Sequence, residues 1–285
     1  MRNIHEPDAQ GFIAGVFNYC DRRCERCMFV RQCRVGAVDQ DDLSEDNEKV
    51  ADENVETYED RLRRVLERPD DNDDAGGPGG DDDGPFDAGM FGGDDEADEE
   101  EMAEFQRKSN ARDELLKAHP LTAQCLAYTQ MVEEWMDPRM DALNARGVAM
   151  HRKQQLQMDP ALRNADALVL EEAVDEVMWF QYMLYVKSQR ALLGKIEDEE
   201  EGDSYGFNPM QSDWNGTAKL TLHIVDRCVA AWNTIAQLMP EETATIEPIV
   251  AHLQRCATAL RALFPDAHQF IRAGFDAHMG SPEEE

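Results

Sequence analysis

The chain has 285 residues, a formal net charge of −32 and seven cysteines. This length suits one large domain or two small ones, and the negative charge argues against direct nucleic-acid binding by the body and against binding to anionic lipid. No apolar run reaches the roughly twenty residues that a membrane span needs, and the first residues lack the apolar core of a secretory signal, so we expect a cytoplasmic protein.

Residues 1–38 form the first predicted unit, a cysteine-rich segment. Cys20, Cys24, Cys27 and Cys33 stand in NYCDRRCERCMFVRQC with the spacing C-x3-C-x2-C-x5-C. Such short spacings favour one shared ligand over pairwise disulfides, and thiolates are the ligands that zinc and iron–sulfur clusters prefer. We therefore predict that all four cysteines bind one metal centre.

The spacing bears on which centre this is. Structural zinc sites usually use two separated C-x2-C pairs, whereas a single short loop can wrap around the four irons of a cubane. A [4Fe–4S] cluster is therefore our first expectation and zinc the alternative. Either centre would be coordinatively closed, which suits electron transfer, oxidation sensing or bracing of the fold better than Lewis-acid catalysis. Five arginines surround the cysteines and are expected to offset their negative charge, with contact to a phosphate as the alternative: Arg22, Arg23, Arg26, Arg31 and Arg34.

Residues 39–106 are predicted to be an acidic, low-complexity linker. Between positions 41 and 104 there are 27 acidic residues and 5 basic ones, and Asp70 to Gly93 reads DDNDDAGGPGGDDDGPFDAGMFGG. This composition buries too little apolar surface to offset the loss of chain entropy, so we expect disorder. Phe86, Met90 and Phe91 leave open a docking motif, and the partner expected for so acidic a chain is a protein with a basic surface.

Residues 107–275 are predicted to be helical, followed by a polar tail at 276–285. Apolar residues recur at helical spacing in about five stretches, at 121–136, 138–158, 160–195, 214–239 and 248–264, and no strand-like alternation competes. We predict an all-α fold, a bundle of four to five helices. The centre of the longest helix, VMWFQYMLYV at 177–186, is apolar on nearly every face and is expected to be buried. Cys125, Cys228 and Cys256 are expected to be small core residues.

Three local resemblances accompany these patterns. Cys20, Cys24 and Cys27 have the spacing of radical S-adenosylmethionine enzymes, but Cys33 can close the open iron that those enzymes need, and the helical body lacks their barrel. The spacing from Cys24 to Cys33 resembles the end of the iron–sulfur loop in the endonuclease III family, which implies a cluster type and not glycosylase activity. NYCDRRCERCMF, EEAVDEVMWFQYMLYVK and WNGTAKLTLHIVDRCVAAWN together resemble a family of bacterial proteins, which implies one architecture for segment and body but no activity.

Polar residues in the helices leave a second function open. Glu176, Lys219, His223 and Asp226 are the candidates for an active site inside the bundle. The competing interpretation is that Glu176, Lys187, Lys219, Asp226 and Arg227 form ion pairs or face solvent. The first hypothesis is thus a metal- or iron–sulfur-binding protein that acts as a redox or protein-interaction module. The alternatives are an enzyme with a structural zinc or cluster, and an acidic mimic of nucleic acid.

Overall fold

The computed structural model describes residues 6–37, 95–150, 154, 157–201 and 209–276. Within these ranges every regular element is a helix, which confirms the all-α prediction. The α-helices are α3 (Asp95–Ala118), α4 (Pro120–Met136), α5 (Met140–Ala145), α7 (Ala165–Glu201), α8 (Asp213–Leu238) and α9 (Thr243–Leu263). Short 3-10 turns lie between and before them: η1 (Cys24–Arg26), η2 (Val30–Gln32), η4 (Asp137–Arg139), η5 (Pro160–Leu162), η6 (Pro209–Gln211), η7 (Pro240–Glu242) and η8 (Ala267–Gln269).

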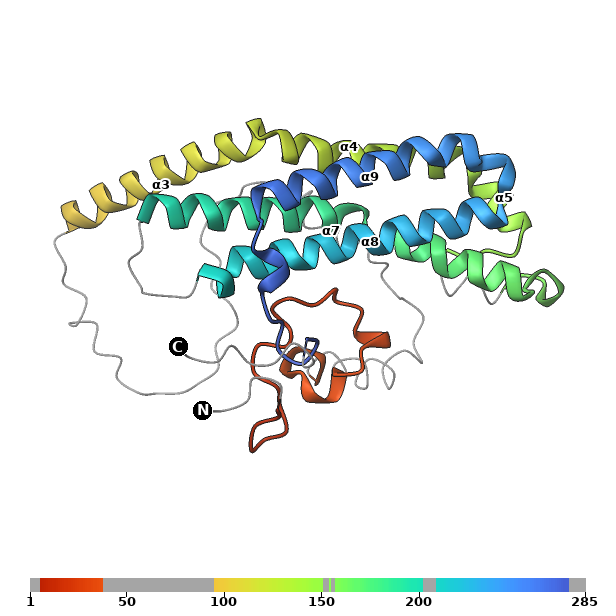
Figure 1. The fold of residues 1–285 in the computed structure, drawn as a ribbon, viewed down its shortest axis with the longest axis horizontal. Helices are drawn as coiled ribbons and strands as arrows, with labels where there is room; N and C mark the ends of the chain where they lie inside the picture. Colours follow the sequence, from red (N-terminus) through yellow and green to blue (C-terminus); the bar gives the residue numbers. More distant parts are fainter. Residues whose placement is uncertain (1–5, 38–94, 151–153, 155–156, 202–208, 277–285) are drawn as a thin grey trace.

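Four long helices enclose the main core. α7 packs along α8 and α4, while α9 packs against α8 and α4 (Figure 1). Tyr128 and Trp232 are fully buried between these helices, and the Trp232 Nε1–H donates to the Tyr128 hydroxyl at 3.2 Å. The predicted core cysteines Cys125, Cys228 and Cys256 are also fully buried. None of the helices in the described part of the chain is long and apolar enough to cross a bilayer.

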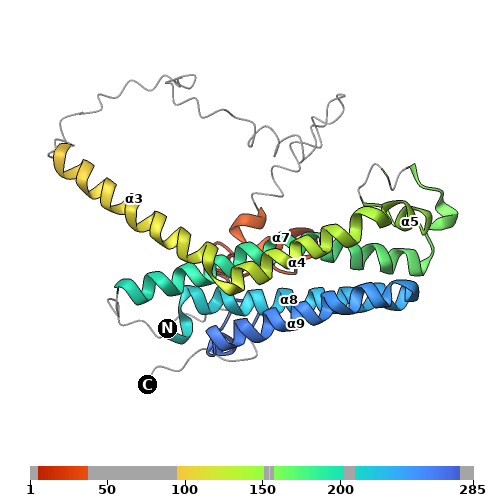
Figure 2. The same ribbon diagram turned by 90° about the horizontal axis from the view of Figure 1, so that it is seen from above.

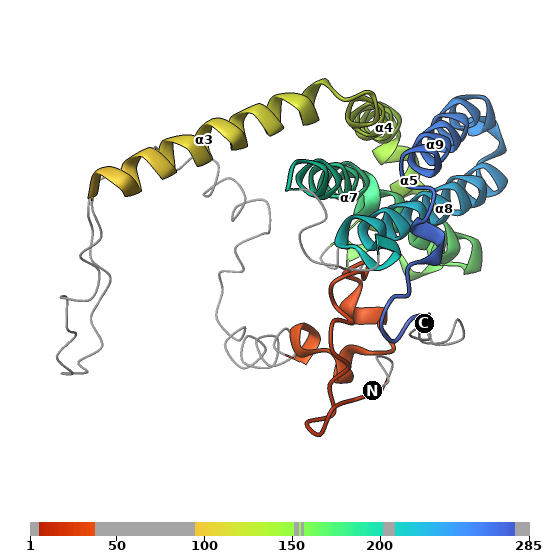
Figure 3. The ribbon, with the colours of Figure 1, turned by 60° about the vertical axis from the view of Figure 1, so that its left-hand side comes forward.

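Helix α3 differs from expectation, because it begins at Asp95, inside the segment predicted to be linker. Residues 95–106 are rich in Glu and Ala and contain neither Gly nor Pro, a composition that favours helix. The start of α3 extends away from the other helices (Figures 2 and 3), and its end meets α4 and α7 through the buried Leu116. Residues 38–94, which include Phe86, Met90 and Phe91, lie outside the described residues.

The predicted helix at 138–158 is wrong in its extent, because α5 ends at Ala145. Gly147 follows with φ +86°, and a Cβ atom there would lie 2.2 Å from the carbonyl oxygen of Leu162. Only glycine fits this turn, so the chain leaves the helix there.

Helix α7 is not buried on nearly every face as predicted. Val177, Phe180 and Leu184 are buried, but Trp179, Tyr182 and Val186 are 39%, 54% and 55% exposed. The buried side faces α4 and α8. An apolar residue looks the same in the sequence whether it faces the core, solvent or another segment. The apolar pattern of α7 therefore could not show which of its faces is buried.

The cysteine segment forms a small second core with the end of the described chain. Ile13, Val16 and Cys33 are buried there, with Phe17, Phe29, Val35, Ala273 and Phe275 packed around them. Figure 1 shows this segment beside the last described residues, outside α7 and α8. A core of three buried residues is too small to hold a segment by itself, so docking onto the helices, or a bound centre, must supply the rest.

Candidate metal centre

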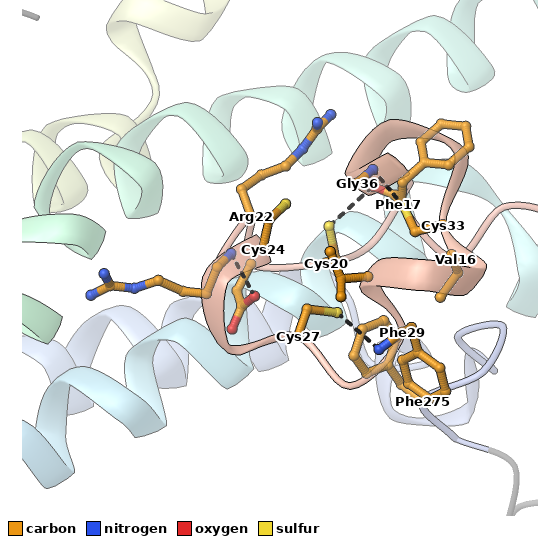
Figure 4. Close-up of a pocket in the computed structure, with 13 residues that line it drawn as sticks. Val16, Phe17, Cys20, Arg22, Cys24, Cys27, Phe29, Cys33, Gly36 and Phe275 are labelled. Atoms are coloured by element: carbon orange, nitrogen blue, oxygen red, sulfur yellow. Dashed lines mark hydrogen bonds between the residues drawn. The ribbon is translucent and has the colours of Figure 1, made fainter. Parts of the chain in front are cut away.

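All four predicted cysteine ligands line one hollow (Figure 4). Cys24 opens η1, Cys27 follows it, and Cys33 follows η2, so two tight turns return the chain three times to the same place. Apolar side chains, among them Val16 and Phe17, complete the lining. The hollow has a volume of about 20 Å³, which is room for roughly one water molecule.

Backbone amides point at two of the sulfurs. The Phe29 N–H donates to Cys27 Sγ and the Gly36 N–H donates to Cys33 Sγ, each at 3.4 Å. A Cβ atom at Gly36 would lie 3.0 Å from the Val30 carbonyl oxygen, so a glycine allows this close turn. The Cys20 thiol instead donates to the Phe17 carbonyl at 3.3 Å. Amide donors favour the thiolate form that metal binding requires.

The sulfurs share the hollow without meeting at one point. Within the described residues, no three Cys, His, Asp or Glu side chains converge in the way that a single metal ion needs. Burial raises the pKa of the Cys27 thiol; the Phe29 N–H opposes this, and the neighbouring Cys20, Asp21 and Cys33 add to it. Ionising several of these thiols together therefore needs a compensating cation.

Positive charge gathers beside Cys20. Arg22 lines the hollow, and it is the one non-glycine residue of the described ranges with a positive φ, 58°, a strained conformation that the surrounding turns must hold. Lys187 of α7 is half-buried and forms no ion pair with any described residue. Burial, followed by the nearby Arg190 and Arg22, lowers its pKa, while Cys20 and Asp213 raise it. Lys187 is thus a partly desolvated cation with Cys20 and Asp213 nearby.

Arg23 fixes the cysteine segment to α7. The side chain is 6% exposed, and its Nη2 lies 2.8 Å from the Asp175 carboxylate and 3.5 Å from Glu176. The guanidinium also stacks on the Trp179 ring at 4.6 Å. The Trp179 Nε1–H in turn donates to the Asp21 carbonyl at 2.9 Å. This buried contact brings the partly exposed Trp179 under the segment.

Two further arginines extend the same network. Arg26 pairs with Glu172 at 3.1 Å and with Asp175 at 2.7 Å. Arg227 of α8 pairs with both Asp21 and Glu176. The carboxylates of α7 therefore hold cations from the cysteine segment on one side and from α8 on the other.

Tyr19 makes the second anchor, on α8. Its hydroxyl donates to Asp213 at 2.9 Å, and Asp213 is held by Arg190 of α7. Burial, followed by the charge of Asp213, raises the pKa of Tyr19 far above its usual value, so the hydroxyl stays protonated. The Tyr19 ring packs edge-on to Phe270 with centroids 4.6 Å apart, and both rings lie against Gly216.

No protein-family model, curated protein or solved structure matches the chain.

Of the four residues considered for catalysis, two are held in ion pairs and two are exposed. Glu176 is buried in the ion pairs with Arg23 and Arg227. Lys219 donates to the Phe270 carbonyl and to Asp276, which ties down the end of the described chain. His223 and Asp226 are exposed on α8, and Asp226 is 4.0 Å from Arg261. Glu176 and Lys219 thus serve as docking contacts in this structure.

Sequence reasoning missed the residues that dock the cysteine segment onto the helices. Asp21, Trp179 and Gly216 were not singled out, and Arg23 was grouped with its neighbours. The available signal was the DRR triplet inside the cysteine pattern, because charged residues there must either face solvent or meet partners elsewhere. The partners lie on helices more than 150 residues away, beyond the reach of local patterns.

Proposed function

We propose that Cys20, Cys24, Cys27 and Cys33 hold a [4Fe–4S] cluster, and that the protein is a cytoplasmic redox or protein-interaction module. The observation that carries this proposal is the shared hollow, lined by four thiols from one loop, with amide donors to two of them. The helical body, taken as a four- to five-helix bundle, is the platform on which the loop is docked.

The lack of three converging donors in the described residues weighs against a preformed zinc site. Tetrahedral zinc with Zn–S bonds of about 2.3 Å requires sulfurs roughly 3.8 Å apart, and no such group of three donors occurs in the described residues. A cubane binds each thiolate at a different iron, so its ligands are spaced more widely. Zinc remains the second candidate, because a hollow of about 20 Å³ favours one ion.

The charges around the hollow suit an anionic centre. A bound cluster would supply one-electron transfer, and four protein ligands leave no open coordination site for substrate. Arg22 and Lys187 are placed to offset the thiolate charge. Arg23, Arg26 and Tyr19 hold the loop against the helices, which would keep the centre at a fixed position for a partner.

Metal analysis on anaerobically purified protein tests the proposal. We expect about four irons and four sulfides per chain with a broad visible absorption, and loss of both on Cys24→Ser or Cys27→Ser. Cys125→Ala, in the main core, is the matched control and should retain the centre. One zinc per chain without sulfide would replace the cluster by the second candidate. Neither metal, in protein purified with its thiols intact, would contradict the proposal.

A further inference from the structure

A second, larger cavity lies next to the cysteine hollow. It has a volume of about 680 Å³ and is bounded by the turn around Arg23 and Glu25, by the end of α4 with η4 and α5, and by the first half of α7. Arg23 lines both cavities. None of the contacts derived for the centre explains why the protein leaves this space open.

Methionine side chains form the apolar floor of this cavity. Met136, Met140, Met150 and Met178 all line it, and all but Met136 remain partly exposed to it or to solvent. Leu168 at the rim is 47% exposed. Flexible thioether side chains adapt to apolar groups of different shape, and they are common on surfaces that bind helices.

The walls of the cavity are acidic. Five carboxylates line it, those of Glu25, Asp137, Glu171, Glu172 and Asp175. Three guanidinium groups pair with them: Arg163 with Glu171, and Arg23 and Arg26 with Asp175, Glu172 and Glu25. Negative charge therefore remains after every such pair is counted, above an apolar floor.

We infer that this cavity is a groove that binds a basic amphipathic helix from a partner protein. Its apolar residues would fill the methionine floor while its lysines or arginines would meet the carboxylate walls, as in other helix-in-groove complexes. A wholly apolar partner would leave the walls unpaired, and a small polar cation would leave the floor uncovered. The shared wall at Arg23 would bring the bound helix next to the cysteine segment.

Binding of a synthetic peptide tests this inference. The probe is a fluorescent amphipathic helix of about 18 residues with leucines on one face and lysines on the other, and the control peptide carries glutamates in place of the lysines. Anisotropy at physiological salt should show saturable binding of the lysine peptide to one site and no binding of the glutamate peptide. Metal content is measured on the same preparation, so the fate of the proposed centre is known separately.

Matched variants separate groove binding from general attraction to an acidic chain. The wall variant Asp137→Asn with Glu172→Gln should weaken binding about tenfold, because each of two exposed charge contacts contributes severalfold. Its control, Asp198→Asn with Glu199→Gln, removes the same charge from an exposed part of α7 and should leave binding unchanged. Met140→Ala should weaken binding severalfold, whereas Met102→Ala on the exposed face of α3 should not.

Three results would overturn the inference: equal loss of affinity in the two charge variants, unchanged affinity in Met140→Ala, or displacement of the peptide by spermine at similar concentration. A measurement on the unmodified protein guards against misfolded variants. With methyl-labelled methionine, the signals of the groove methionines should shift on peptide addition while that of Met102 stays in place.

Discussion

The Arg23 guanidinium is stabilised almost entirely by its partners, because burial removes it from water. Moving a cation into the interior costs several kcal/mol unless carboxylates and hydrogen-bond acceptors surround it. Asp175, Glu176 and the Asp175 carbonyl supply these, and Trp179 covers the flat face of the group. Arg23 therefore makes the buried contact between the cysteine segment and α7.

Replacing Arg23 by Gln should lower the free energy of unfolding by about 1.5–3 kcal/mol, the range for hydrogen bonds to charged groups, because Glu176 keeps Arg227 and Asp175 keeps Arg26 as partners. Urea denaturation followed by circular dichroism measures the change. Lys108→Gln breaks the exposed pair with Glu104 and should leave the free energy of unfolding unchanged. Equal stability of the two variants would show that the Arg23 contacts contribute nothing net.

Single residues also show which features of the cysteine segment could be predicted from the sequence. The cysteine spacing was enough to predict that four thiols share one place, because the loop between them is short. The same stretch could not separate Arg22, which is exposed, from Arg23, which is buried, because the difference depends on where α7 lies. The shared position of the four thiols could be predicted locally, and the docking of their loop onto the helices could not.

At the scale of elements, the contact between the cysteine segment and α8 depends on a missing side chain. A Cβ atom at Gly216 would lie 2.5 Å from the Tyr19 ring and 2.6 Å from the Phe270 ring. Rigid aromatic rings on both sides cannot both yield, so alanine there must displace the segment from the helix.

Gly216→Ala should lower the free energy of unfolding by about 1–2 kcal/mol, because overpacking costs about 1–3 kcal/mol and the gain in helix propensity, up to about 1 kcal/mol, offsets part of it. It should also speed modification of the segment's cysteines by a thiol reagent in metal-free protein. Asn233→Ala, at an exposed position of α8, should raise stability slightly through helix propensity and leave the thiol reactivity unchanged. Unchanged thiol reactivity in Gly216→Ala would exclude this anchor.

The helices themselves were largely readable from apolar spacing. α4 and α8 begin and end within a residue or so of the predicted ranges, whereas α9 begins five residues before Pro248. The failures have local causes: Gly147 ends α5 early, and helix-forming residues carry α3 back to Asp95. The exposed face of α7 could not be foreseen, because apolar content does not say which side a neighbour covers.

At the scale of the whole molecule, the two ends of the described chain hold each other in place. Phe275 packs edge-on to Phe29 of the cysteine segment at 5.0 Å, and Asp276 locks this end to the body. Its carboxylate accepts from Lys219 Nζ at 2.8 Å and from the Arg272 guanidinium at 3.1 Å. Contacts between positions so far apart along the chain leave no periodic signal in the sequence.

The contacts of Asp276 with Lys219 and Arg272 should weaken in acid. Burial alone would raise the pKa of Asp276, but hydrogen bonds from Arg272 and Lys219 outweigh it and lower the pKa to about 2, against about 3.9 in an unfolded chain. Because the folded pKa is the lower one, the stabilisation is complete above pH 4 and is lost as pH falls toward 2. Between these values, the unfolding free energy should fall by up to about 2 kcal/mol more in the wild type than in Asp276→Asn. Urea titrations from pH 2 to 6 measure this, with the exposed Asp198→Asn as the control that should follow the wild type. Parallel curves of unfolding free energy against pH for wild type and Asp276→Asn would mean that the Asp276 contacts contribute no pH dependence.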